Sequence, residues 1–110
     1  MMTFLHFLDE MSRSDNRDLK SRLIVLISHL LKLRYVSGDE VVSNQRGWNV
    51  TLKVQRSEVA DLLLTAPSLK AHLTEEIATC YARASRVFAR EYPRIELPPT
   101  CPFTADEILS

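Results

Sequence analysis

Three arginines in the second half of the chain carry the sharpest chemical signal of the sequence. Arg83, Arg86 and Arg90 recur three and four residues apart, a spacing that places side chains on one edge of a helix. None of them has an acidic residue four positions earlier, because those positions hold Thr79, Ala82 and Arg86. Unpaired guanidinium groups in such a row can bind phosphates or the carboxylates of a partner. The alternative is a solvated face, or pairing with acids of another helix, because long basic side chains commonly coat protein surfaces.

His29 lies at the rim of an apolar helical arc, where it could titrate near neutral pH or bind a metal. A metal site needs several convergent ligands, and neither His6 nor His72 lies three or four residues from His29. The sequence also contains no HxxxH, HExxH or CxxC motif. We therefore expect a hydrogen-bonded structural histidine at this position, and neither a metal nor a cofactor.

A further helical face combines an aromatic and a polar residue. Trp48 and Gln55 fall on the same side of a helix as the apolar residues Leu52, Val59 and Leu62. We predict that Trp48 anchors the core. A buried amide must find hydrogen-bond partners, so Gln55 is predicted to bond a neighbouring loop or helix end. The alternative is a polar contact that lines a ligand pocket.

The chain offers no recognisable catalytic motif. No GxSxG turn accompanies its serines, and two glycines cannot build a glycine-rich phosphate loop. Glu75 and Glu76 are adjacent in sequence, and adjacent residues point to different faces of a helix. We therefore expect that the protein is not an enzyme.

Length and composition indicate one globular domain, residues 1–110. Hydrophobic residues make up 45% and charged residues 25%, ordinary values for a folded chain. The 14 basic residues balance the 14 acidic ones, so binding to nucleic acid would require a local patch. Cys80 and Cys101 form no CxxC pair, which favours reduced thiols and a cytoplasmic location. The longest apolar run, at 23–27, is too short to span a bilayer, so we expect no membrane association.

Apolar residues at helical spacing predict about four main helices and a docked terminal turn. The predicted segments are a short helix at 1–11, a central helix at 15–35, two further helices at 46–65 and 69–92, and a tail at 93–110. The sequence SRSDN at 12–16 separates the first two helices, and a loop is predicted at 36–47. In the tail, Thr104 and Glu107 have the spacing of a capping box, and Ile108 is available to dock the last helical turn. The predicted fold is an all-α bundle.

The segment GWNVTLKVQR, residues 47–56, is the one stretch whose pattern points elsewhere. Apolar and polar residues alternate along it, which is typical of a half-buried strand. A lone strand cannot satisfy its own backbone, and the chain offers no partner strand of adequate length. We therefore interpret the segment as helical, although Val50 and Val54 then fall outside the apolar face of that helix.

Five segments, in this order and spacing, together resemble a bacterial family known as domain of unknown function 29. They are HLLKLRY at 29–35, WNVTLKVQR at 48–56, PSL at 67–69, YARASRVFARE at 81–91 and CPFTADEIL at 101–109. The resemblance implies an all-α fold and transfers no activity or catalytic residue. Members of the family typically carry a further aromatic-rich segment ahead of FLHFLDEM, so this chain resembles an N-terminally short member. Its first helix would then lack a packing partner, which favours either self-association or a true start of the protein ahead of this sequence.

Two functions therefore follow from the sequence. The first is a non-catalytic module that binds an unknown protein partner or a second copy of itself. The alternative is a binder of nucleic acid or of a phosphate ligand through Arg83, Arg86 and Arg90. The lack of a catalytic motif and the first helix without a packing partner favour the first function.

Overall fold

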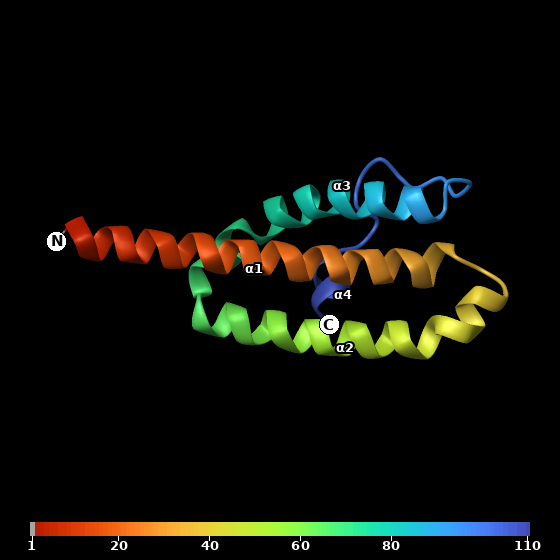
Figure 1. Ribbon diagram of the computed structural model, residues 1–110, viewed down its shortest axis with the longest axis horizontal. Coiled ribbons are helices and arrows are strands. Elements are labelled where there is room, and N and C mark those ends of the chain that lie inside the picture. Colours follow the sequence, from red (N-terminus) through yellow and green to blue (C-terminus); the bar gives the residue numbers. More distant parts are fainter. Residues whose placement is uncertain (1) are drawn as a thin grey trace.

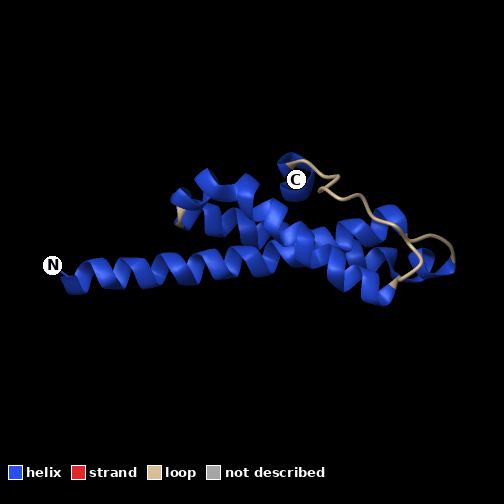
Figure 2. Cartoon of the chain, turned by 90° about the horizontal axis from the view of Figure 1, so that it is seen from above, coloured by secondary structure: helices blue, strands red, loops and turns tan. Residues whose placement is uncertain are grey.

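The computed structural model describes the backbone of residues 2–110 and the side chains of residues 14–110. It contains four α-helices and one 3₁₀ helix: α1 (Met2–Tyr35), α2 (Asp39–Thr65), η1 (Pro67–His72), α3 (Leu73–Glu91) and α4 (Ala105–Leu109). No strand occurs in residues 2–110, as Figure 2 shows. The predicted all-α fold with a short C-terminal helix is confirmed.

Helix α1 occupies the middle of the bundle. Figure 1 shows it running between α2 and α3, and it contacts both of them as well as α4. Its second half carries side chains that are completely buried: Leu19, Leu23, Leu26, Ile27 and Leu31. A helix that is covered from several sides must be apolar over a broad arc, which explains the wide apolar pattern of residues 19–33.

The predicted break between helices at 1–11 and 15–35 is wrong. Helix α1 continues through residues 12–16 to Tyr35 without interruption. The segment SRSDN contains neither proline nor glycine, and serine, aspartate and asparagine lower helix propensity without breaking a helix. The apolar face predicted for residues 1–11 lies outside the residues whose side chains the structure describes.

Helix α2 begins at Asp39, seven residues before the predicted start at 46, so the predicted loop shrinks to residues 36–38. Gly38 makes the turn with a φ of 84°, a conformation that other residues rarely adopt. Asp39 and Glu40 then occupy the first turn, where their negative charges interact favourably with the positive end of the helix dipole. Residues 47–56 are helical as predicted, and Val50 and Val54 point to solvent.

The predicted helix at 69–92 is divided into η1 and α3. The 3₁₀ helix η1 starts with Pro67, which is suited to the first position of a helix because it has no amide hydrogen to satisfy. The Leu69 amide donates to the Ala66 carbonyl at 3.1 Å, and this tight turn places the Leu69 side chain in the core with 6% of its surface exposed. The regular α-helical pattern therefore starts only at Leu73.

The C-terminal segment closes the core. Thr104 and Glu107 form the predicted capping box, with hydrogen bonds of 3.2 and 3.1 Å between the side chain of each and the backbone of the other. Ile108 of α4 is completely buried, and Phe103 is 9% exposed. The Arg56 guanidinium of α2 donates to the last carbonyls of α4, which have no partner within the helix.

Candidate functional site

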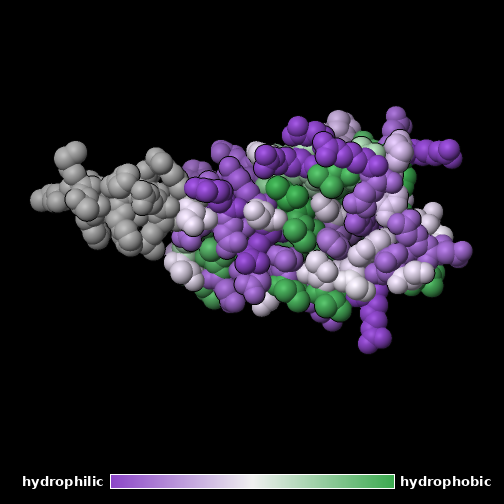
Figure 3. All heavy atoms as spheres, in the orientation of Figure 1, coloured by the Kyte–Doolittle hydropathy of each residue, from purple (hydrophilic) through white to green (hydrophobic). Residues whose placement is uncertain are grey.

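Arg83, Arg86 and Arg90 lie together, as their spacing predicts. With Val87 of α3 and Ile24 of α1 they line a hollow of about 350 Å³, which we call the arginine hollow. All three arginines are exposed, and Val87 keeps 45% of its surface accessible. In Figure 3, hydrophobic atoms lie between the positions of α1 and α3 with hydrophilic groups around them. The arginine hollow thus has an apolar floor and a basic rim.

Acidic partners are absent from this rim among residues 14–110. The ion pairs within that range do not include any of the three arginines. Asp18, one of the acids that could have neutralised them, pairs instead with Arg22 at 3.1 Å. The Arg86 Nε donates to the Ala82 carbonyl at 3.3 Å, and no carboxylate of residues 14–110 forms an ion pair with this guanidinium. An anion with an apolar portion would find complementary groups here.

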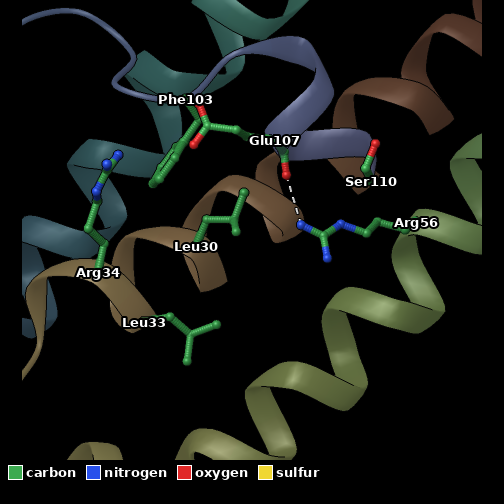
Figure 4. A pocket seen from close by; sticks show the side chains of 7 residues that line it. All are labelled: Leu30, Leu33, Arg34, Arg56, Phe103, Glu107 and Ser110. Carbon is green, nitrogen blue, oxygen red and sulfur yellow. Dashed lines mark hydrogen bonds between the residues drawn. The ribbon is translucent and has the colours of Figure 1, made fainter.

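A second hollow of about 490 Å³ lies between α1, α2 and the C-terminal segment (Figure 4). Leu30, Leu33 and Phe103 form its apolar part, while Arg34 and Arg56 stand at its edges. Both guanidinium groups already make contacts within the fold. Arg34 lies 5.2 Å from the Phe103 ring centroid and donates to the Pro102 carbonyl at 3.4 Å.

Arg56 donates to the carbonyls of Ile108 and Glu107 at 3.0 and 2.8 Å, and Figure 4 shows the second of these bonds. This role of Arg56 could not be predicted from the sequence, because residues 51 and 52 positions apart carry no local signal of contact. We interpret the second hollow as a docking point for α4 and not as the primary ligand site.

His29, Gln55 and Trp48 do not belong to the arginine hollow. The His29 Nδ1 lies 2.8 Å from the Val25 carbonyl of its own helix. The Gln55 Oε1 accepts from the Arg22 Nη1 at 3.2 Å and thereby joins α2 to α1. Trp48 is half-buried against the core, with the Lys32 ammonium 5.8 Å from the centre of its ring. The partner of Gln55 differs from the predicted one, because it is a side chain within α1 and not a loop or a helix end.

The two thiols are poorly suited to nucleophilic chemistry. Burial and the nearby Glu76 carboxylate raise the pKa of Cys80 to about 11. Burial also raises the pKa of Cys101. Because the thiolate is the reactive form, both groups are weak nucleophiles at neutral pH. Both cysteines are free.

The outward side of α2 exposes several apolar side chains. We define the outer face of α2 as Gly47, Val50, Val54, Ser57 and Leu64, which recur at helical spacing and are all exposed. Val50 is 54% exposed, Val54 51% and Leu64 76%. Figure 3 shows hydrophobic atoms along the edge of the molecule where α2 lies in Figure 1. Two charges on this side, Arg46 and Asp61, form no ion pair with any other residue of 14–110.

Two kinds of site receive no support from the described residues. Within residues 14–110, no three His, Cys, Asp or Glu side chains are grouped closely enough to hold a metal ion. None of the described helices combines the length and the apolar character that a membrane crossing needs.

Comparison with known proteins places the chain in a family without giving it an activity. Neither the curated proteins nor the solved structures include a significant match. A family model described as a domain of unknown function, DUF29, matches residues 4–110. This match covers nearly the entire chain. The protein is therefore a member of the DUF29 family.

Proposed function

We propose that this protein is a non-catalytic interaction module that binds another protein surface through the outer face of α2. The observation that carries the proposal is the exposure of Val50 and Val54, more than half of each side chain, on the side of α2 opposite the core. Both are β-branched and cost helix propensity, and neither gains burial in the isolated chain. A partner that covered them would supply the burial that the monomer lacks.

The shape of this surface also suits a helical partner. Small residues, Gly47 and Ser57, lie on the same face as the two valines, so the backbone of another helix can approach closely. Charged side chains at the edge of the face, Arg46 and Lys53, supply a polar rim. A small apolar centre with a charged rim is the common layout of protein interfaces.

The test is capture of a partner by tagged protein from a lysate of its native host, with and without nuclease. We expect one stoichiometric protein to be retained in both conditions. Val50→Lys together with Val54→Lys should abolish its retention, because two ammonium groups would be buried in the interface. Ala89→Lys, an exposed change on α3, is the matched control and should retain the partner. Retention by the double lysine variant would refute the proposal.

A second function has an observation of its own. The arginine hollow has an apolar floor and three guanidinium groups, which have no acidic partners among residues 14–110. This combination favours binding of a phosphate-bearing ligand or nucleic acid. Its binding should weaken steeply with salt, because phosphate contacts release counterions.

Charge reversal distinguishes specific binding at the arginine hollow from nonspecific electrostatic attraction set by the net charge. Arg83, Arg86 and Arg90 changed to Glu should abolish binding to single- and double-stranded oligonucleotides in a fluorescence titration. The control changes three other exposed cations, Arg17, Lys53 and Lys70, to Glu and so produces the same net charge. Equal loss in both triple variants would show that the arginine hollow has no specific role.

A further inference from the structure

The charges on the exposed side of α2 change sign along the helix, and this order constrains the direction of a partner helix. Arg46 precedes the two valines, and Lys53 lies between them. Glu58 and Asp61 follow the valines, toward the end of the helix. Glu58 is engaged with Arg22 at 3.8 Å, but Arg46, Lys53 and Asp61 form no ion pair within residues 14–110. The outer face of α2 thus has a basic start, an apolar centre and an acidic end.

We propose that the surface which covers the outer face of α2 is a second copy of this chain, paired with its α2 antiparallel to the first. This inference rests on the proposed function and names its partner. A two-fold axis passes between Val50 and Val54, so that Val50 of each copy packs on Val54 of the other. Such an interface is self-complementary, as closed dimers with two-fold symmetry require.

The charge pattern selects the antiparallel arrangement. With the axis between Val50 and Val54, Arg46 of one copy lies within about one helical turn of Asp61 of the other, a distance that an arginine side chain spans. The symmetry forms this contact twice. In a parallel pair the same residues would oppose themselves, Arg46 on Arg46 and Asp61 on Asp61, which like charges disfavour.

The length of the outer face of α2 sets the expected affinity of the dimer. With the axis between Val50 and Val54, residues 39–65 of each α2 lie along the other copy, a length of about 40 Å. One helix pair of this length buries on the order of 1,000 Å², the lower end for a specific interface. We therefore expect a dimer with a dissociation constant on the order of micromolar, which dissociates on dilution.

Sedimentation equilibrium of the purified chain over the micromolar to millimolar range tests the dimer and its charge pairs together. Arg46→Asp and Asp61→Arg should each raise the dissociation constant about tenfold, since each replaces two attractions by two repulsions. The doubly changed chain should return to within about threefold of the wild-type value, because the pairs are restored with exchanged signs. All the changes lie on the surface, and far-ultraviolet circular dichroism establishes that each variant keeps its helical content.

Cross-linking tests the direction of the pairing independently. Leu64→Cys should form no intermolecular disulfide, because antiparallel α2 helices place the two Leu64 positions near opposite ends of the interface, more than about 30 Å apart along the helices. A mixture of Gly47→Cys and Ser57→Cys chains should cross-link, because the two-fold axis places these two positions directly opposite each other. The cross-link should exceed any background from the native thiols of the unchanged chain. A Leu64→Cys disulfide, or a double variant as weak as the single ones, would overturn the antiparallel pairing.

The outcomes distinguish this inference from the function on which it rests. A chain that stays monomeric up to millimolar concentration overturns the self-pairing. The interaction function then stands without the inference if wild type retains a different protein from the lysate and the chain with both Val50→Lys and Val54→Lys does not. A dimer that forms equally well with both lysines present overturns the inference as well, since the outer face of α2 would not be its interface.

Discussion

Helices α2 and α3 flank the same central helix, but they are attached to it in different ways. Helix α3 has 19 residues and buries five of them, whereas α2 has 27 residues and buries three. Ion pairs support α3 near both of its ends, Lys20 with Glu76 at 3.7 Å and Lys32 with Glu91 at 3.3 Å. Helix α3 is therefore held mainly by its own packing on α1.

Helix α2 depends more on polar contacts with other segments. Gln55 accepts from Arg22 of α1, and Arg56 holds the end of α4. With few buried side chains for its length, α2 has apolar residues left over for its exposed side, including Val50 and Val54. The difference teaches that the longer helix contributes less to the core and more to the available surface.

The largest effect that this comparison predicts is the loss of a core side chain from α3. Phe88 is 1% exposed and stacks near Tyr92, with 4.9 Å between the ring centroids. Phe88→Ala should lower the free energy of unfolding by about 3–5 kcal/mol, measured by urea denaturation, because it leaves a large cavity. Val87→Ala, on the exposed side of the same turn, should change it by less than about 0.5 kcal/mol. Similar losses for the two variants would contradict the assignment of α3 as a core helix.

The second prediction concerns the polar attachment of α2. Arg56→Ala leaves the last carbonyls of α4 without their donor, and should cost about 1–3 kcal/mol in the free energy of unfolding. The loss should appear first at α4, as faster amide hydrogen exchange at Ile108 than at residues of α3. Arg46→Ala, which removes an exposed cation of the same helix without a hydrogen bond to α4, is the control. Unchanged exchange at Ile108 would show that apolar docking alone holds α4.

The third prediction uses pH to probe the packing of α3 on α1. The Cys80 thiol is 1% exposed and lies 3.6 Å from the Lys20 carbonyl, and burial raises its pKa from 9.0 to about 11. Since the folded chain holds this proton more tightly than the unfolded chain, the associated stability is present below pH 9 and is lost as the pH rises through 11. Between pH 8 and 10.5 the free energy of unfolding should fall about 1–2 kcal/mol more in wild type than in Cys80→Ala. Equal pH dependence in the two chains would mean that the thiolate forms without penalty.

Local patterns were sufficient to predict the fold class and several of its parts. The capping box of Thr104 and Glu107 and the shared edge of Arg83, Arg86 and Arg90 depend on spacings within one helical turn or two, and both are present. The continuity of α1 through 12–16 was missed because capping residues such as Ser14 and Asp15 also occur inside helices.

Contacts between distant segments could not be predicted in this way. Arg22 with Gln55 and Arg56 with α4 join residues 33 to 52 positions apart, and no periodicity encodes such a pair. The exposed side of α2 was visible in the sequence as valines outside the apolar face, but the absence of any covering segment within residues 14–110 required the packed structure. The predicted start of α2 at 46 was wrong because residues 36–47 were predicted to form a loop, whereas the helix begins at Asp39 and continues through Gly47.

The smallest predicted change in the free energy of unfolding is at Gly47. It tests directly how much the packing of α2 contributes to its stability. Gly47 lies inside α2 with ordinary helical backbone, and an added Cβ would meet no atom within 4 Å. Gly47→Ala should therefore raise the free energy of unfolding by about 0.5–1 kcal/mol, because alanine loses less backbone entropy in a helix. Gly38→Ala is the opposite control: its φ of 84° opposes a side chain, so the free energy should fall by about 1–2 kcal/mol. In a helix fixed by packing, such propensities are easily outweighed. A clear gain at Gly47 would show that α2 depends on its own helical stability, whereas a loss would mean that the outer face of α2 is already in close contact with another surface.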